Sequence, residues 1–373
     1  MNFSYTEEQQ SIFDLASQIL IKGTPQERLL ELERAEGPRF DPELWAKLGQ
    51  SGLIGVAVPT EYDGGGLSFL EVAGVIEHIG RTSAPVPYFE TVVLGGLAIA
   101  EFGSEAQKKA ILPELAAGNR IMTAALIEPE GEIEYPGVQA TASDGGWKLD
   151  GVKSYVPGAE IADVILVSAM TDRGPAVFLV DPKAAGVRLE ALATTSYMPE
   201  SRMTLNGVTL DADSLLGTLT SGREIIEWID LRANAALCNM ALGCCEAALE
   251  MTAEYSKTRK QFDQPIAMFQ SVAHRQADAY IDTQAVRLTA LEVAWMISVG
   301  RDAREEVAIA KHFAAEAGYR VTFSAQHIHG GVGVDREYPV HRYYIYARHI
   351  ELMLGGSTHH MRRLGEMLAD TAA

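Results

Sequence analysis

Apolar residues recur at helical spacing along the first third of the chain. Thr6 and Gln9 have the spacing of a capping box, and apolar residues on one helical face follow them. Gly52–Ser68 contains a proline and three consecutive glycines, which predicts a loop-rich segment. Further helices are predicted over residues 42–51, 69–81, 90–103 and 105–117.

The pattern changes to a period of two between about residue 120 and residue 215. Trp147–Leu149 alternates, and Asp150-Gly151 has the composition of a hairpin turn. The apolar runs Val164–Val167 and Ala176–Val180 predict buried strands, the second of which ends at a proline. This segment is expected to form a small antiparallel β domain.

Helical spacing returns at about residue 221 and continues to the end of the sequence. The pattern predicts helices over 222–257, 266–299, 303–328 and 340–370, a set typical of a helical bundle. The predicted class is therefore α+β, in helical, β, helical order. The expected domains are residues 1–118, 119–220 and 221–373.

Composition narrows the possible functions. The 373 residues carry a formal net charge of −19, which argues against binding to nucleic acid or to an anionic membrane surface. No apolar run approaches the length of a membrane span, and the first residues lack the pattern of a secretory signal. Cys238, Cys244 and Cys245 are expected to be buried thiols in a reducing cytoplasm. We therefore expect a cytoplasmic protein without disulfides.

Common catalytic signatures are missing from the sequence. It has no nucleophile elbow, P-loop or zinc-protease motif. Gly331-x-Gly333 follows a predicted helix instead of a strand, so it does not indicate a Rossmann site. Adjacent His359 and His360 diverge on a helix and lack cysteine or carboxylate companions, so no metal site is expected.

Two segments remain as candidates for ligand binding. Arg259-x-Gln261-Phe262 joins two long predicted helices, with Gln270 shortly after it. Arg259 is either a favourable charge at a helix C-terminus or a guanidinium offered to a phosphate, with Phe262 as an aromatic ledge. In the second segment, Gly330-Gly331 either ends a helix or lets the backbone approach a ligand closely.

Together these segments resemble the acyl-CoA dehydrogenase family along the whole chain. The Arg259 segment with Gln270 matches the family's R-x-Q-F-G…Q motif. His329-Gly330-Gly331-x-Gly333, followed by Glu337-Tyr338-Pro339, matches its C-terminal G-G-x-G…[ED]-[YF]-P motif. Shorter matches are Gly52-Leu53-x-Gly55…Pro59-x-x-Tyr62 and Phe102-Gly103-Ser104-Glu105.

The resemblance implies FAD chemistry on an acyl-CoA thioester. In the family, a glutamate removes the α proton and the flavin accepts the β hydrogen as hydride, with electron-transfer flavoprotein as the expected acceptor. FAD lies across a subunit interface, where one subunit's β domain holds the flavin ring. The neighbour holds the adenosine and pyrophosphate end. The implied cofactor-binding residues here are Arg259, Gln261, Phe262, Gln270, His327, Gly330 and Gly331.

The sequence departs from the family at the catalytic base. The family's E-G-T motif falls on Leu354-Gly355-Gly356, so the base position is a leucine, and no catalytic residue is assigned. An alternative position used by some members falls on Ala233. Asp230 and Glu351 lie about one helical turn from these two positions and are the weak candidates for a displaced base.

The flavin-contacting part of the middle domain also departs from the family. Glu128-Pro129 is retained, but the permissive loop that should follow carries Glu130, Glu132 and Glu134. These carboxylates would repel a pyrophosphate. Pro157 replaces a threonine whose hydroxyl would bond the flavin. A downstream R-D pair of the family falls on Ile345-Tyr346.

The pattern is most similar to the base-lacking subunit of heterotetrameric (α2β2) actinobacterial acyl-CoA dehydrogenases of cholesterol side-chain breakdown. Leu192–Thr195, Tyr338–Tyr343 and Leu354–Gly356 carry this closer resemblance. It implies a homologous catalytic partner whose FAD site this chain completes. A self-sufficient homotetramer using Asp230 or Glu351 and a flavin-free scaffold remain alternatives. Pocket shape sets acyl specificity, which the sequence leaves open.

Overall fold

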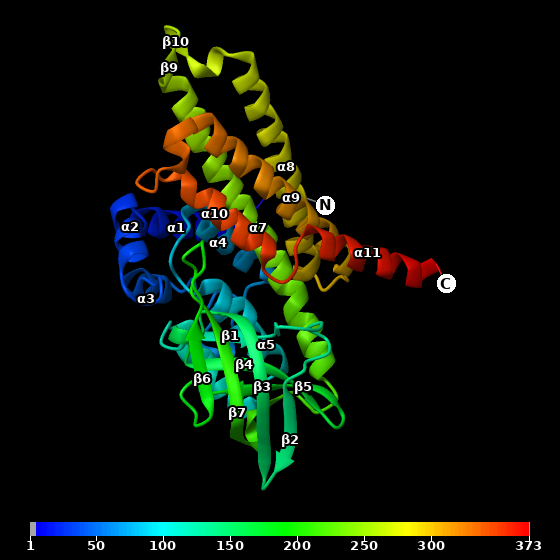
Figure 1. Cartoon of the computed structure of the whole chain (residues 1–373). Coiled ribbons are helices and arrows are strands. Elements are labelled where there is room, and N and C mark those ends of the chain that lie inside the picture. The colour runs from blue at the N-terminus through cyan, green and yellow to red at the C-terminus, as the bar shows by residue number, and fades with distance from the viewer. Residues whose placement is uncertain (1–4, 373) are drawn as a thin grey trace. The chain divides into compact units, whose positions relative to one another are not determined.

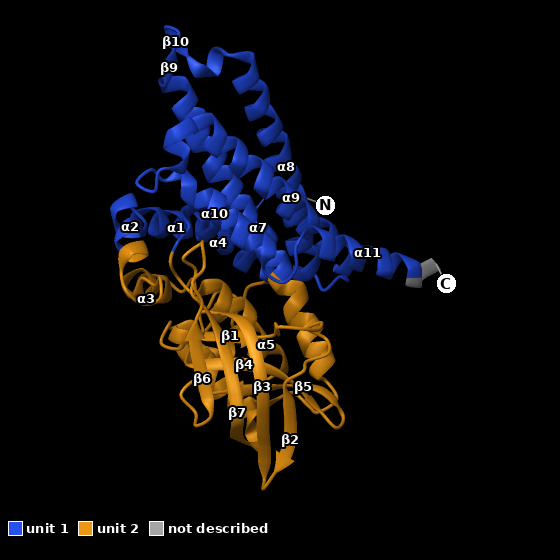
Figure 2. Cartoon of the chain, viewed as in Figure 1, with its two compact units in different colours: residues 1–31, 69–84, 234–373 blue, residues 32–68, 85–233 orange. Residues whose placement is uncertain are grey.

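The structure is a computed structural model in which residues 5–372 are described (Figure 1). The chain forms two compact units (Figure 2). Unit 1 comprises residues 1–31, 69–84 and 234–373, and unit 2 comprises residues 32–68 and 85–233. Each unit therefore combines segments that lie far apart in the sequence.

Unit 1 is helical. Its α-helices are α1 (Glu7–Gly23), the start of α2 (Gln26–Arg34), α4 (Phe69–Thr82), most of α7 (Gly222–Thr258), α8 (Gln270–Ser298), α9 (Arg304–His329), α10 (Val340–Leu352) and α11 (Ser357–Ala372). Short pieces connect them: β9 (Lys260–Gln261), β10 (Gln264–Pro265), η5 (Ile266–Met268) and η6 (Gly330–Val334). The longest helices, α7, α8 and α9, form the body of this unit (Figure 1).

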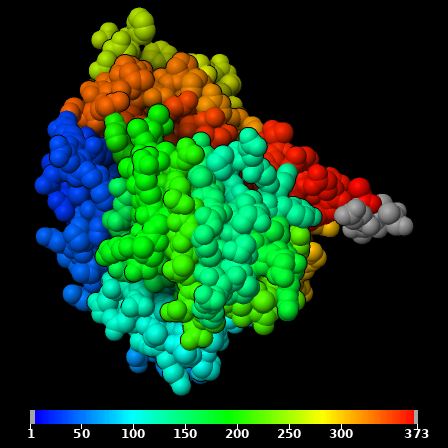
Figure 3. Space-filling view, turned by 60° about the horizontal axis from the view of Figure 1, so that its bottom comes forward, coloured from blue at the N-terminus to red at the C-terminus, as the bar shows by residue number. Residues whose placement is uncertain are grey.

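Unit 2 contains the sheet and several helical segments. These segments are α3 (Pro42–Gln50), η1 (Thr60–Tyr62), the π-helix η2 (Phe89–Gly96), α5 (Leu97–Phe102), α6 (Glu105–Ala116), η3 (Ala159–Ile161) and η4 (Ala212–Ser214). The strands are β1 (Met122–Ala125), β2 (Gln139–Ser143), β3 (Gly146–Pro157), β4 (Val164–Thr171), β5 (Gly174–Val180), β6 (Val187–Ala191), β7 (Glu200–Asp211) and β8 (Leu215–Leu216). In the space-filling view, turquoise to green atoms of this unit form one continuous area of the visible face (Figure 3).

The sheet confirms the predicted α+β class. Its order is β6-β7-β3-β2-β4-β5-β8, with β1 paired to β4. The pairs are antiparallel except for β1 with β4 and the short contact of β2 with β4, which are parallel. The expectation of an antiparallel domain therefore holds for most of the sheet. Apolar side chains such as Leu149, Val167 and Phe178 form its core.

The hairpin predicted at Asp150-Gly151 is wrong. The turn lies at Asp144-Gly145, because Ser143 of β2 pairs with Gly146 of β3. Asp150-Gly151 instead lies within β3, where the pairing with β7 shifts register between Leu149 and Gly151. Gly151 adopts a φ of 146°, which only glycine accepts easily. The second Asp-Gly therefore forms an irregularity in a long strand.

Several helix boundaries also differ from the prediction. The capping box of Thr6 and Gln9 is present at the start of α1. The helix predicted over residues 340–370 is two helices, because Leu354 and Gly355 between α10 and α11 have positive φ values of 53° and 98°. Helix α2 was missed in the sequence, since only Leu29 of its residues is fully buried.

Helices α4 and α7 approach closely within unit 1. A Cβ atom on Gly80 would lie 2.0 Å from the carbonyl oxygen of Met240, and one on Gly243 would lie 1.8 Å from that of Glu77. Both positions therefore require glycine. The three cysteines expected to be buried are free thiols inside α7, and all are buried. No helix among residues 5–372 is long and apolar enough to cross a membrane.

Candidate functional site

The Arg259 segment is the tip of the hairpin that joins α7 to α8 (Figure 1). Arg259 follows the last turn of α7, and its carbonyl oxygen accepts a hydrogen bond from the Ile266 amide at 2.8 Å. Phe262 is 87% exposed and adopts a φ of 52°, a conformation that a phenylalanine seldom takes. The exposed side chains of Arg259, Gln261 and Phe262 can thus meet a ligand or a neighbouring chain.

The Gly330-Gly331 segment follows the last turn of α9. Gly330 has a φ of 63°, and a Cβ atom on either glycine would meet no other atom within 4 Å. Gly333 differs, since its Cβ would lie 2.2 Å from the Gln326 carbonyl oxygen. The first two glycines therefore present bare, accessible backbone, whereas the third serves packing. His327 is exposed and stacks on Phe323 with ring centroids 6.2 Å apart.

Three aromatic rings join the ends of α7 and α9. Tyr255, in the last turn of α7, stacks on His329 with centroids 4.2 Å apart and an interplanar angle of 25°. Tyr338, after η6, lies 5.3 Å from His329 and 6.3 Å from Tyr255. These contacts bring together two segments that lie 71 positions apart in the sequence, since Arg259 and Gly330 each follow one of the joined helix ends.

The predicted base position lies in the connection between α10 and α11. Leu354 adopts a φ of 53° there, and its carbonyl oxygen contacts His360 Nε2 at 3.2 Å. Lys311 Nζ donates to four carbonyl oxygens around this connection, at 3.0 to 3.1 Å: those of Ile350, Glu351, Met353 and Gly355. The connection is therefore held firmly, and its residue 354 has no ionisable side chain.

The two displaced-base candidates lie in different units. Glu351, in α10 of unit 1, forms an ion pair with Arg348. Burial raises the pKa of Glu351, and the Arg348 charge opposes that rise. Asp230 is only 2% exposed and belongs to the part of α7 in unit 2. The contacts of Glu351 do not single it out as a base.

Glu128, which matches the family motif, closes the loop of unit 2 that carries Glu130, Glu132 and Glu134. Its carboxylate accepts hydrogen bonds from the amides of Gly137 at 2.7 Å and Val138 at 3.1 Å. It also accepts one from the fully buried Lys153 ammonium at 2.5 Å. Lys153 donates further to Ser168 Oγ at 2.8 Å. These contacts of Glu128 thus hold the two ends of residues 128–138 together and close the loop.

The loop so closed carries the acidic side chains predicted to oppose flavin phosphates. Glu130 and Glu132 are exposed, and Glu134 is half-buried. Exposed Tyr135 lies under the guanidinium of Arg223, whose carbon is 4.6 Å from the ring centroid. This cation–π contact ties the loop to the start of α7.

The end of β3 combines strain with buried carboxyl groups. Tyr155 adopts a φ of 51° and is 56% exposed, while Pro157 ends the strand opposite Glu200 of β7. Burial raises the pKa of Glu90, in the π-helix η2, to about 7, and that of Glu200 also to about 7. Pro157 thus stands where the family has a threonine hydroxyl. The two nearby carboxyl groups lie in surroundings that disfavour their ionisation.

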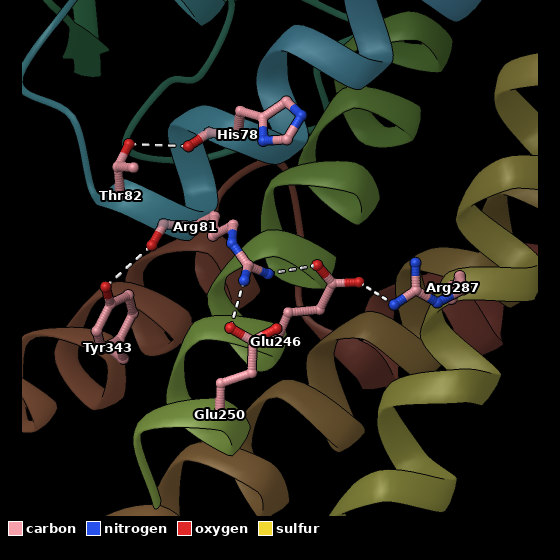
Figure 4. Close-up of polar contacts among 7 residues, drawn as sticks. All are labelled: His78, Arg81, Thr82, Glu246, Glu250, Arg287 and Tyr343. Atoms are coloured by element: carbon pink, nitrogen blue, oxygen red, sulfur yellow. Dashed lines mark hydrogen bonds and ion pairs between the residues drawn. The ribbon is translucent and has the colours of Figure 1, made fainter. Parts of the chain in front are cut away.

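Sequence reasoning missed a charge network in unit 1 that is centred on the largely buried Glu246 (Figure 4). Arg81 of α4 pairs with Glu246 at 2.9 Å and also with Glu250, both on α7. Arg287 of α8 pairs with the other oxygen of Glu246. Tyr343 of α10 donates its hydroxyl to the Arg81 carbonyl oxygen at 2.9 Å. The network thus joins four helices of unit 1.

The comparisons with known proteins define the class. Family models match residues 6–119 (acyl-CoA dehydrogenase, N-terminal domain), 124–208 (middle domain) and 222–369 (C-terminal domain). The chain therefore belongs to the acyl-CoA dehydrogenase family, whose members are FAD-dependent oxidoreductases. The resemblance inferred from the motifs is confirmed.

Several relatives are similar to the chain over nearly its whole length. Acyl-CoA dehydrogenase FadE27 of Mycobacterium tuberculosis is 40% identical over 381 residues, and the match covers 100% of both chains. A chain in the crystal structure of the ChsE4–ChsE5 complex from Mycobacterium tuberculosis is 40% identical, with a TM-score of 0.95 and 100% coverage of both chains. A variant of the Tcur3481–Tcur3483 steroid ACAD is 37% identical, with a TM-score of 0.92 and coverage of 98% of this chain and 99% of that one.

Proposed function

We propose that this chain is the base-lacking subunit of a hetero-oligomeric, FAD-dependent acyl-CoA dehydrogenase. One observation carries the proposal. The connection that holds the base position is kept in place by Lys311 but presents Leu354 there. The chain completes the FAD site of a catalytic partner and leaves removal of the α proton to that partner.

The residues of unit 1 fit the dinucleotide end of FAD. Arg259 supplies a guanidinium that matches a phosphate, and the bare backbone of Gly330-Gly331 permits a close approach. Exposed Phe262 supplies an aromatic face, while Gln261, Gln270 and His327 add exposed polar groups. Bound FAD would supply the hydride acceptor, and these side chains would bind and orient it.

The contacts in unit 2 support the proposal that the β domain of the partner, and not that of this chain, holds the flavin ring. Glu128 is engaged by Lys153 and by two amides, so it is not available to a ligand. The loop it closes presents Glu130 and Glu132 to the exterior. Negative charges at this position oppose a pyrophosphate. We therefore propose that the β domain of this chain does not hold a flavin of its own.

A homologous partner subunit is supported by exposed apolar side chains on two packed helices. They are Tyr280, Ile281 and Leu288 of α8 and Ile309, Phe313 and Phe323 of α9, with exposed fractions of 37% to 64%. Apolar groups concentrated in this way are typical of protein interfaces. Two similar structures carry the names of complexes, ChsE4–ChsE5 and Tcur3481–Tcur3483.

The proposed substrate is an acyl-CoA of a steroid side chain, bound mainly by the partner. The support is the similarity to a protein named as a steroid ACAD. Electron-transfer flavoprotein is the proposed acceptor and the cytoplasm the proposed location. Both follow from the family resemblance and the acidic composition.

The test compares the chain alone with the chain co-purified with the family member encoded by a neighbouring gene. We expect flavin and dehydrogenase activity only in the mixed complex. Arg259→Ala in that complex should weaken FAD binding at least tenfold. Arg304→Ala removes an exposed arginine paired with Asp302, and should leave binding unchanged. A yellow, active preparation of the chain alone would contradict the proposal.

The alternatives give different results in the same assays. A self-sufficient enzyme would lose flavin reduction by substrate on Asp230→Asn or Glu351→Gln. A flavin-free scaffold would show unchanged FAD affinity in the Arg259→Ala complex. Under the proposal, both carboxylate variants retain activity when the partner's base is intact.

A further inference from the structure

Tyr255, His329 and Tyr338 form a three-ring clamp at the exposed end of unit 1. His329 is only 3% exposed and contacts both other rings, which also contact each other. Tyr255 belongs to the last turn of α7, four residues before Arg259, and His329 directly precedes Gly330. The Arg259 amide donates to the Tyr255 carbonyl oxygen at 2.8 Å. This hydrogen bond ties the backbone of Arg259 to the helical turn that carries the Tyr255 ring.

The clamp rests on a small apolar cluster. Ala248, Ala325 and Val340 are buried together, and Tyr338 packs against them. These residues come from α7, α9 and α10, so the cluster connects the same three segments as the rings. The alanines contribute little bulk, so the spacing of the helix ends depends on the three rings together with Met251 and Tyr343, which also pack against the cluster.

The hydrogen bonds of His329 define its tautomer. Nδ1 lies 2.8 Å from the Ala325 carbonyl oxygen, which only accepts, so Nδ1 carries the proton. Nε2 is buried and has no hydrogen-bond partner among the residues the structure describes. A neutral ring therefore has an unused acceptor at Nε2, whereas a protonated ring would place a charged donor there without an acceptor.

We infer that His329 is a positioning residue that sets the Arg259 hairpin against the Gly330-Gly331 turn. The inference rests on the proposed function, because it assigns the spacing of these two elements to recognition of the dinucleotide. His329 does not touch the ligand in this account. It keeps two ligand-binding elements at the separation that lets both engage one molecule.

The clamp is expected to weaken in acid. Burial lowers the pKa of His329 below 6.5, although its bond to Ala325 opposes this shift. The neutral form is thus favoured in the clamp, so its stabilising contribution is present above pH 6.5 and is lost as the pH falls.

The groups near the ring do not reverse this sign. Tyr255 of α7 and Tyr338 contact the ring through their aromatic groups. On α10, His341 Nδ1 is engaged with the Tyr338 carbonyl oxygen at 2.7 Å. On α9 itself, His327 is exposed and stacks on Phe323 instead. None of these groups is a hydrogen-bond partner of the His329 Nε2.

The experiment measures FAD affinity of the mixed complex between pH 7.5 and pH 5.5. The wild-type complex should lose about tenfold in affinity over this range. His329→Phe keeps a flat ring against both tyrosines but cannot be protonated, so it should bind FAD well and lose the acid sensitivity. His329→Ala removes the ring and should bind about tenfold more weakly at every pH. His312→Ala, elsewhere on α9, should follow the wild-type profile.

A second readout does not involve FAD. In the cofactor-free complex, the protection of backbone amides in the last turns of α7 and α9 against hydrogen exchange, corrected for the slower intrinsic exchange at low pH, should fall in acid. This fall should vanish in His329→Phe. Identical acid profiles of the wild type and His329→Phe would overturn the inference. If Arg259→Ala leaves FAD affinity unchanged, the proposed function fails, whereas the exchange experiment still decides whether the clamp exists.

Discussion

The Lys311 ammonium nitrogen lies 3.0 Å from the carbonyl oxygen of Met353, 42 residues further along the chain. Three more carbonyl oxygens surround the same nitrogen, and Lys311 is only 1% exposed. A buried ammonium is costly unless acceptors satisfy it, and here the backbone supplies them. The end of α10 contributes aligned carbonyls, which favour a cation. One side chain of α9 therefore fixes the connection that contains Leu354.

Lys311→Met should destabilise the chain by about 3 kcal/mol. The substitution keeps most of the side-chain volume but leaves several carbonyl oxygens of the α10–α11 connection without a donor. Urea denaturation of the purified protein measures the change. Lys22→Met removes an exposed lysine of α1 and should change stability by less than about 0.5 kcal/mol. Equal midpoints for the two variants would show that the carbonyl cage is dispensable.

Glu77→Gln should make the protein more stable above pH 7. Burial and the nearby Glu246 raise the pKa of Glu77 to about 7, against 4.5 for an ordinary glutamate. Ionisation is thus disfavoured in the folded state, so stability present below pH 4.5 is lost as the pH rises through 7. The wild type should lose about 2 kcal/mol between pH 5 and pH 8, a loss that the glutamine variant avoids.

Denaturant midpoints at pH 5, 6.5 and 8 test this expectation. Glu254→Gln is the control, because its exposed carboxylate pairs with Lys257 on the surface of α7. It should retain the pH dependence of the wild type. A Glu77→Gln protein with the same slope as the control would mean that Glu77 ionises freely despite its burial.

Gly243→Ala should destabilise unit 1 although alanine is the better helix former. The new Cβ would lie 1.8 Å from the Glu77 carbonyl oxygen, so α4 and α7 must separate. We expect a loss of about 2 kcal/mol or more. Gly318→Ala is a matched control in α9, because its Cβ would meet only Ala347 Cβ, at 4.0 Å. That variant should gain up to about 1 kcal/mol, and thermal unfolding of both proteins distinguishes the two signs.

Lys153→Met should weaken the sheet of unit 2. It removes the buried cation that faces Glu128 at 2.5 Å and leaves a largely buried carboxylate with only its two amide donors. A loss of about 3 kcal/mol is expected. The double variant with Glu128→Gln should recover part of it, since no buried charge then remains. Lys148→Met changes an exposed lysine on the same strand and provides the baseline. Full additivity of Lys153→Met and Glu128→Gln would argue against a coupled pair.

Local signals in the sequence predicted most of the fold. The Thr6 capping box is read correctly because donor and acceptor lie within one helical turn. The two Asp-Gly pairs show the limit of such signals. Asp144-Gly145 forms a turn and Asp150-Gly151 does not. The difference lies in β7, which is hydrogen-bonded to β3 on both sides of Asp150-Gly151. A neighbouring strand more than 50 residues away decides which dipeptide is the hairpin.

The candidate site likewise contains residues that local motifs reveal and residues that they do not. Arg259 and Gly330 lie in contiguous motifs, so the sequence shows them directly. Lys311 gives no such signal, because its partners are backbone carbonyls that every residue carries. Arg81 and Glu246 are 165 positions apart, and their pairing depends on the close approach of α4 and α7 through two glycines. Contacts of this kind follow from packing and are invisible to a motif search.

Chemical labelling of the three cysteines of α7 can report unfolding of the native protein. All are buried, and burial raises the pKa of Cys238 and that of Cys245 to about 12. Thiol reagents attack the thiolate, so labelling must wait until the long central helix separates from its neighbours. The rate of modification by a maleimide thus counts opening events of unit 1 directly, with no engineered label and no signal from unit 2.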